Sequence, residues 1–166
     1  MNKTTLFIYL FLILIGIQSY SQTPSCDSIY TSFSAVEYHV NDKILAPEVR
    51  FELSGGNHFS QESKDSIDVI ANFLKLHPTM VIEVGVHTDS RGTALANTDI
   101  SSRRAERIID YLIEKHNISP DRLVARGYGE SCPLITDEMI NATESLPKKE
   151  WFHQQNRRVE IRVLTP

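Results

Sequence analysis

The sequence predicts an α+β fold: a two-layer sandwich of the order β-α-β-α-β-β, with helices on one face of a mixed four-stranded sheet. Three observations predict it. Stretches in which apolar and polar residues alternate are separated by stretches with apolar residues at helical spacing. Each predicted strand has one polar face, which indicates that helices cover only one side of the sheet. Strand–helix–strand connections of this length imply some parallel pairing.

Length and composition predict one ordinary domain with a modest tail. The chain has 166 residues, with 17 Lys and Arg against 21 Asp and Glu, and a net charge of −4. Its 41% hydrophobic and 23% charged content is that of a globular protein. The acidic balance argues against a nucleic-acid partner. Two cysteines are too few for a disulfide scaffold or a four-cysteine zinc site.

The N-terminus has the pattern of a secretory signal peptide over residues 1–21. Lys3 precedes an apolar run over residues 6–17, and small polar residues follow, with cleavage expected after Ser21. The rest of the chain divides into an N-terminal arm over residues 22–44, of which residues 22–35 are expected to be loose, and a domain over residues 45–166. The sequence therefore predicts an exported protein.

Export would place Cys26 and Cys132 in an oxidising compartment. One disulfide between them and two unpaired thiols are equally compatible with the sequence, and both interpretations stay open. A lipid on Cys26 is disfavoured because this residue lies well past the apolar run. An uncleaved anchor is disfavoured because that run is shorter than the roughly 18–20 residues that span a bilayer.

The first predicted elements are a strand, a helix and a second strand. Residues 49–53 alternate apolar and polar side chains and predict a half-buried strand. Ser60 is a suitable N-cap for the helix that follows, and Pro78 ends that helix after His77. Residues 80–86 alternate again and predict the second strand.

The second strand carries Glu83 and His87 on the side opposite its apolar residues. A long helix follows from about Ser102 to Lys115, with Ser101 as its expected N-cap. Its buried face holds apolar residues at helical spacing.

The remaining pattern predicts two further strands. Asn117 fits the left-handed position after the long helix. Residues 123–128 predict the third strand, residues 134–150 a polar loop with room for one helical turn, and residues 159–163 the last strand.

The loop after the second strand and the start of the long helix carry the chemistry. Arg103, Arg104 and Arg107 would fall in the first helical turns, where the helix dipole disfavours cations. A guanidinium with free helix N–H groups suits a carboxylate or phosphate. Asp89 adds a negative group, so the pair would match a ligand with ammonium and carboxylate on one carbon. The alternative is an Asp89–Arg104 salt bridge that ties loop to helix, and spacing alone slightly favours it.

Four short motifs follow one another along the chain. They are His87-Thr88-Asp89-x-x-Gly92, Asn97-x-x-Ile100-Ser101-x-x-Arg104-Ala105, Gly127-Tyr128-Gly129-Glu130-x-x-Pro133 and Asn156-Arg157-Arg158-Val159-Glu160-Ile161. Together and in this order they resemble the signature of the OmpA-like C-terminal domain family. The resemblance covers about residues 45–165.

The resemblance implies non-covalent binding of peptidoglycan stem peptides. In such domains the residue matching Asp89 takes the ammonium group of diaminopimelate, and the residue matching Arg104 takes its α-carboxylate as a fork. Asn97 and Thr88 match positions that shape or line the pocket. Ile100 replaces the more usual Leu and is expected to pack on the ligand stem.

Two parts of the chain within this resemblance are not expected to bind the ligand directly. The Asn-Arg-Arg turn, with Arg157 and Arg158, is expected to serve structure more than ligand. The segment 134–155 is longer than the usual loop before that turn. Its Trp151-Phe152-His153 run is expected to cover the sheet edge, favoured about two to one over a partner site.

The expected function is non-catalytic binding of peptidoglycan in the periplasm of a Gram-negative bacterium, linking or anchoring the cell envelope. No cofactor and no nucleic acid are expected. An outer-membrane protein is a candidate partner, and the protein is expected to be a monomer or weak dimer. The alternative is a metal-dependent cell-wall hydrolase or another envelope enzyme. It is disfavoured because the sequence has no His-Glu-x-x-His motif and no Gly-x-Ser-x-Gly motif.

Overall fold

The computed structural model describes residues 26, 29–49 and 59–166. The predicted signal peptide, and all of the strand predicted over 49–53 except Val49, lie outside these residues. In chain order the described elements are β1 (Lys43–Leu45), α1 (Gln61–Leu76), β2 (Val81–His87), α2 (Ala94–His116), a 3₁₀ turn (Pro120–Arg122), β3 (Leu123–Gly129), α3 (Asp137–Asn141), α4 (Leu146–Asn156) and β4 (Val159–Thr165).

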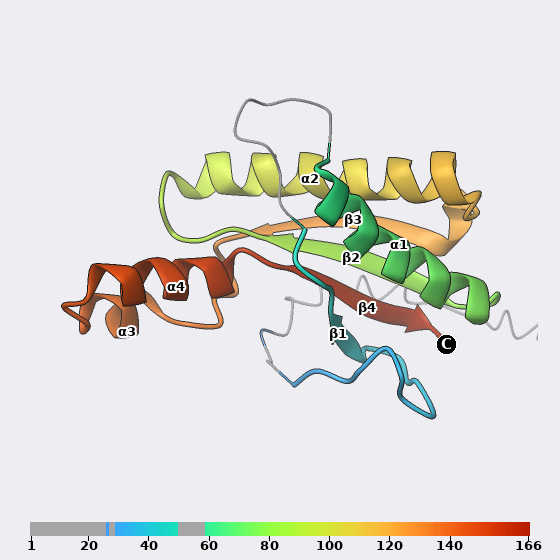
Figure 1. The fold of residues 1–166 in the computed structure, drawn as a ribbon, viewed down its shortest axis with the longest axis horizontal. Helices are drawn as coiled ribbons and strands as arrows, with labels where there is room; N and C mark the ends of the chain where they lie inside the picture. Colours follow the sequence, from blue (N-terminus) through green and yellow to red (C-terminus); the bar gives the residue numbers. More distant parts are fainter. Residues whose placement is uncertain (1–25, 27–28, 50–58) are drawn as a thin grey trace, which may run out of the picture.

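The strands form one mixed four-stranded sheet in the order β1-β4-β2-β3. β2 pairs in parallel with β3, while β4 runs antiparallel to both β1 and β2. Both α1 and α2 lie on the same side of this sheet (Figure 1). The predicted fold class is therefore confirmed. Within the described residues the edge strand beside β4 is β1, a short segment at the end of the expected arm.

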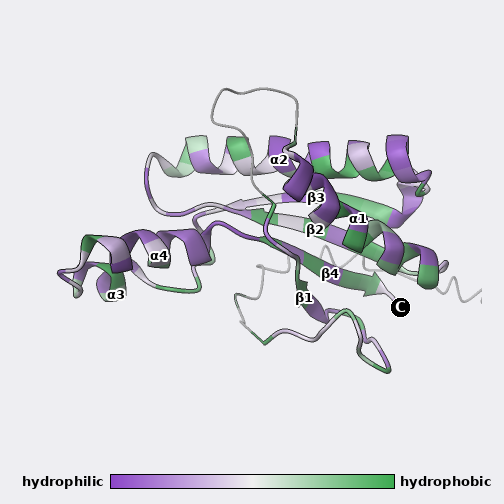
Figure 2. Ribbon diagram, in the orientation of Figure 1, coloured by the Kyte–Doolittle hydropathy of each residue, from purple (hydrophilic) through white to green (hydrophobic). Residues whose placement is uncertain are grey.

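The apolar core lies between the sheet and the two long helices. Ile82 and Val84 of β2 and Ile161 of β4 are fully buried, as are Ile108 and Leu112 of α2. Burying one such side chain stabilises the fold by about 1.5–3 kcal/mol. In Figure 2 hydrophobic and hydrophilic residues alternate along α1 and α2, and hydrophobic residues occupy parts of β2 and β4.

The long helix α2 begins eight residues earlier than its predicted start at Ser102. Thr93 is the N-cap, and its hydroxyl accepts a hydrogen bond from Ala96 N at 3.2 Å. The prediction of Ser101 as the cap is wrong. Its Oγ instead donates to Thr98 O and accepts from Gly129 N at 3.0 Å. The extra turns were missed because residues 94–101 include several weak helix formers, and packing against β3 overrides that preference.

α2 approaches β3 closely because Gly127 has no side chain. A Cβ added at Gly127 would lie 2.3 Å from Ser102 N, so the helix backbone rests directly on the strand. At the other end, Asn117 has φ 55° and ends the helix in the left-handed region, as predicted. The contact with β3 thus fixes the depth of the helix over the sheet.

The segment predicted as a polar loop over 134–150 contains two helices, α3 and α4. Thr136 and Ser145 cap them. Periodicity missed α4 because its residues are polar almost all round. Asn156 fastens the base of the segment: its Oδ1 accepts from Leu134 N and Ile135 N at 2.9 Å, and its amide donates to Ile135 O. The α3–α4 segment projects from one end of the sheet (Figure 1).

The described part of the arm packs on the domain, contrary to the expectation of a loose arm. Phe33 and Tyr38 each make an edge contact with Phe73 of α1, with ring centroids 5.2 Å apart. Cys26 and Cys132 form a disulfide in the structure, with their Cα atoms 5.2 Å apart. This is one of the two states that the sequence leaves open. The predicted domain boundary itself stays a prediction.

The second face of the sheet is polar, as the strand pattern predicts, but much of it is buried. Glu83 Oε1 accepts from the Tyr128 hydroxyl at 2.6 Å and lies 3.7 Å from Arg162 Nε. Burial and the hydrogen bond from Glu83 together raise the pKa of Tyr128. Several charged and aromatic side chains share this face, and we call them the sheet-face cluster: Tyr30, Glu83, His87, Tyr128, Arg158, Glu160 and Arg162.

Glu160 is the second carboxylate of the sheet-face cluster. It accepts hydrogen bonds from the Tyr30 hydroxyl and from Arg158 Nε, and lies 3.4 Å from His87 Nε2. Burial works to raise the pKa of Glu160, but His87, Arg158 and Tyr30 hold it well below its usual range. His87 stacks on Tyr128 with centroids 4.6 Å apart. Burial lowers the pKa of His87, although Glu160 acts to raise it. The lowered pKa favours the neutral imidazole.

Candidate functional site

The predicted site begins where β2 and β3 end side by side. Because these strands are parallel, their carboxyl ends meet at one edge of the sheet. Thr88 N donates to Gly129 O at 2.9 Å and fixes the start of the loop over residues 88–92. Gly92 has φ +109° and Gly129 φ +54°, conformations that L side chains rarely adopt. The two glycines therefore set the local turns that present Asp89.

Asp89 is a buried carboxylate held by two arginines. Its side chain is 8% exposed. Oδ2 accepts from Arg91 Nε at 3.2 Å, from Arg91 Nη2 at 2.6 Å and from Arg157 Nη1 at 2.5 Å, while Oδ1 accepts from Arg91 N at 3.0 Å. Burial works to raise the pKa of Asp89, but the hydrogen bonds from Arg91 and Arg157 lower it to about 2. The carboxylate is therefore ionised at neutral pH.

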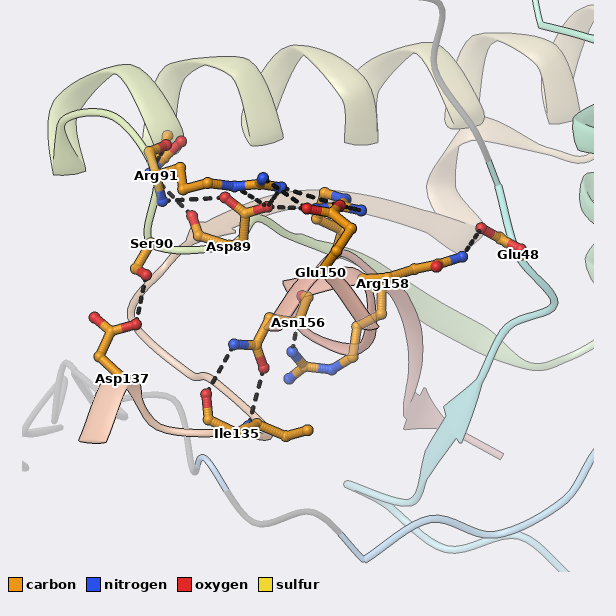
Figure 3. Close-up of polar contacts among 12 residues, drawn as sticks. Glu48, Asp89, Ser90, Arg91, Ile135, Asp137, Glu150, Asn156 and Arg158 are labelled. Carbon is orange, nitrogen blue, oxygen red and sulfur yellow. Dashed lines mark hydrogen bonds and ion pairs between the residues drawn. The ribbon is translucent and has the colours of Figure 1, made fainter. Parts of the chain in front are cut away.

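A second carboxylate reaches the same arginines from α4. Glu150 Oε2 accepts from Arg91 Nη1 at 2.8 Å, and Oε1 accepts from Arg157 Nη2 at 3.0 Å. In Figure 3 Asp89, Arg91 and Glu150 lie next to one another beside the long helix. These pairs raise the pKa of Arg91 and lower that of Glu150.

Arg104 approaches the same group of charges from α2. Burial, together with the charge of Arg157, lowers its pKa, and the charge of Asp89 opposes this effect. Arg104 lies in the third turn of α2, so the prediction that it sits at a helix start, beside free N–H groups, is wrong. We call the resulting set the site cluster: Asp89, Arg91, Arg104, Glu150 and Arg157.

Asn97 shapes the loop beneath the site cluster. It is 7% exposed, and its Nδ2 donates to Asp89 O at 3.1 Å, to Arg91 O at 3.3 Å and to the Glu130 carboxylate. Thr88 is buried, and its hydroxyl has no hydrogen-bond partner among the described residues. Ile100 is partly buried on α2. The structure thus brings Thr88 and Asn97 together with Asp89, and their role in lining a ligand pocket stays a prediction.

Two members of the site cluster were missed by sequence reasoning, and the role of a third stays a prediction. Arg157 is expected to serve structure more than ligand, and the ion pair of its Nη1 with Asp89 is compatible with that expectation. Arg91 stands two residues after Asp89, and that spacing is a usable local signal. Glu150 had no sequence signal, because its contact with Arg91 spans 59 residues and starts in the segment taken for a loop.

The aromatic run of the segment lies on α4. Trp151 is 53% exposed, and it contacts the neighbouring Phe152 at 5.4 Å between ring centroids. Cover of the sheet edge by the Trp151-Phe152-His153 run stays a prediction.

The site cluster combines three guanidinium groups with two carboxylates. Its guanidiniums and carboxylates are suited to bind ammonium and carboxylate groups. In the described part of the chain, no group of three or more His, Cys, Asp or Glu side chains is arranged to hold a metal ion. Within the same residues, no helix has the length and apolar character needed to cross a membrane.

Comparisons with known sequences show which family the chain is similar to. Residues 51–145, more than half of the chain, match the model of the OmpA family. The chain is 36% identical over 124 residues to outer membrane porin F of Pseudomonas fluorescens, covering 72% of this chain and 35% of that protein. It is 38% identical over 134 residues to outer membrane protein A of Escherichia coli O157:H7, covering 81% and 35%. The chain thus spans about a third of the length of these relatives.

Solved structures share the fold. The peptidoglycan-associated lipoprotein of Burkholderia pseudomallei matches with a TM-score of 0.54 and 23% identity, over 69% of this chain and 87% of that chain. The cell wall anchor of the T6SS from Pseudomonas aeruginosa matches with a TM-score of 0.52 and 26% identity, over 69% and 75%. Together with the family match, these similarities establish that the chain belongs to the OmpA family.

Proposed function

We propose that this protein binds peptidoglycan non-covalently and anchors the cell envelope, without catalysis. The family supports this role, and two of the similar structures are by name a peptidoglycan-associated lipoprotein and a cell wall anchor. The observation that carries the proposal is the buried, ionised Asp89 beside Arg104 of α2, where the charge of Asp89 opposes the lowering of the Arg104 pKa by burial and by Arg157. This arrangement suits a ligand that bears both charges.

The proposed ligand group is the diaminopimelate residue of the stem peptide. The Asp89 carboxylate takes its ammonium group, and the Arg104 guanidinium takes the neighbouring carboxylate. A simple anion is repelled by Asp89 and a simple cation by Arg104, so only a group with both charges satisfies the site. Thr88 and Asn97 shape the pocket, and Ile100 supports the aliphatic stem of the ligand.

The experiment is co-sedimentation of the purified protein with sacculi. Asp89→Ala and Arg104→Ala should each weaken binding by about 30- to 5,000-fold, because one partner of a buried charged contact is lost. Asp99→Ala and Arg103→Ala are matched controls, since these neighbours form an exposed i, i+4 pair on the same helix. If both site variants sedimented as the wild type does, the assignment of the site would be wrong.

Competition then identifies the ligand. Free diaminopimelate should displace the protein from sacculi, and lysine and phosphate should do so much less at about 0.15 M salt. Equal displacement by phosphate would indicate a general anion site, and equal displacement by lysine a site for any α-amino acid.

A further inference from the structure

The α3–α4 segment places a carboxylate on two arginines of the site. Arg91 contacts Asp89 through Nε and Nη2, and Glu150 through Nη1 at 2.8 Å. Arg157 contacts Asp89 through Nη1, and Glu150 through Nη2 at 3.0 Å. Each guanidinium therefore joins two carboxylates. We call that of Asp89 the inner carboxylate and that of Glu150, which belongs to α4 of the same chain, the outer carboxylate.

The two carboxylates differ sharply in their surroundings. The Asp89 side chain is 8% exposed, while that of Glu150 is 55% exposed. The arginine side chains between them are 53% and 35% exposed. Ion pairs this open to water contribute little, so the outer carboxylate is replaceable and the inner one is not.

The attachment of the segment allows Glu150 to leave. Asn156 holds the base of the segment through three hydrogen bonds to residues 134 and 135. Away from the base, Ser90 Oγ donates to Asp137 Oδ1 at 2.5 Å, a contact between exposed side chains (Figure 3). Rotation of the Glu150 side chain breaks none of these bonds.

We infer that Arg91 and Arg157 form a second carboxylate subsite, which Glu150 fills from within until a ligand carboxylate replaces it. This inference rests on the proposed function, because diaminopimelate carries two amphoteric centres and so two carboxylates. Arg104 takes the first carboxylate, and the Arg91–Arg157 pair takes the second. The chemical class of ligand is then a stem peptide whose second diaminopimelate carboxylate is free.

The first test is calorimetric titration of the full chain and of Glu150→Gln with free diaminopimelate. The variant should bind about two- to tenfold more tightly, because the internal competitor has lost its charge. Glu144→Gln, the same change at an exposed position of the same segment, should leave the affinity unchanged. Lysine, and diaminopimelate with one carboxylate amidated, should gain nothing from Glu150→Gln.

Weaker or unchanged diaminopimelate binding by Glu150→Gln would overturn the inference. It would indicate that Glu150 only holds the two arginines in place, or that it does not affect the site. An equal gain for lysine would overturn it too, since lysine has no second carboxylate.

A second test does not depend on peptidoglycan. Acetate is titrated while the side-chain N–H signals of Arg91 and Arg157 are followed by NMR. These signals should shift at lower acetate concentration in Glu150→Gln than in the wild type. Equal responses would overturn the subsite. If the wild type failed to bind sacculi but acetate gave the expected difference, the proposed function would fail and the carboxylate subsite would stand.

Discussion

The sheet-face cluster and the site cluster are built from the same chemistry, carboxylates beside arginines, yet they differ in access to water. In the first, Glu83, Glu160 and Arg162 are each less than 10% exposed. In the second, only Asp89 is buried to this degree, and the arginine side chains that hold it are 53% and 35% exposed. A sealed cluster must satisfy its charges internally, whereas a half-open one can exchange a partner for a ligand. Under the proposed function, this difference in access to water distinguishes a structural charge cluster from one that binds a ligand.

The largest expected change in stability comes from removing a carboxylate of the sheet-face cluster. Glu83→Ala should lower the free energy of unfolding by about 3–5 kcal/mol, because it leaves Arg162 and the Tyr128 hydroxyl buried without their partner. Asp89→Ala should lower it less, since the arginines it releases reach solvent. Urea denaturation of both variants measures the contrast. Equal losses would show that the two clusters are not energetically different.

The next effect concerns the disulfide between Cys26 and Cys132. It joins the arm that carries Tyr30 to the domain, so it supports the sheet-face cluster. Replacing both cysteines with serine should lower the free energy of unfolding by about 2–4 kcal/mol. Sacculus binding of the folded variant should stay within about twofold of the wild type. A larger loss of affinity would show that the arm also shapes the site.

A smaller effect is expected in the site cluster, on the affinity for the ligand rather than on stability. Arg104→Lys keeps the charge but removes the planar fork, so affinity for diaminopimelate should fall by about tenfold. The free energy of unfolding should barely change. Competition for sacculi measures the affinity, with Arg103→Lys as the control on the exposed side of α2. Full retention of affinity would mean that the guanidinium geometry is not used.

The smallest effect is the pH dependence of stability through His87. Its folded-state pKa lies below its ordinary value of 6.5, so the unfolded chain takes up the proton first. This contribution is present above about pH 6.5 and is lost as the pH falls toward the folded-state pKa. Thermal unfolding between pH 7 and 5 should show a shallow loss of stability in the wild type and a smaller one in His87→Gln. An identical slope would exclude His87 as the cause.

The stabilising contribution of Asp89, in the site cluster, is lost at a lower pH than that of His87. The pKa of Asp89 is about 2, so its stabilising contribution is present above the ordinary carboxyl pKa and is lost only as the pH falls toward 2.

The spacing of apolar residues predicted the helices and strands that bury one face. It did not predict the helix α4, which has no apolar face. The cap at Ser60, the strands β2 and β4 and the left-handed Asn117 follow from local patterns. α4 was missed because a helix that is polar all round has no apolar stripe to detect. The early start of α2 was missed because its first turns are stabilised by contact with β3 rather than by intrinsic propensity.

The proximity of the candidate site residues could be predicted from the sequence only in part. Asp89, Asn97 and Thr88 belong to one short stretch, and the structure brings them together. Arg157 and Glu150 reach Asp89 or its arginine only through the tertiary fold, over separations of 68 and 59 residues. Pairing across such distances is decided by where α4 and β4 lie, and no local pattern carries that information.

The position of β4 has a consequence for the order of folding. β4 follows all the other described elements along the sequence, yet it lies between β1 and β2 in the sheet. Until residues 159–165 are available, the β2–β3 pair and the β1 edge have no common strand to join them. The contacts that close the sheet are therefore long-range, which makes folding slower than in proteins rich in local contacts. A chain still emerging during synthesis should expose the apolar side of β2, and cooperative folding of this sheet should begin only once β4 has been made.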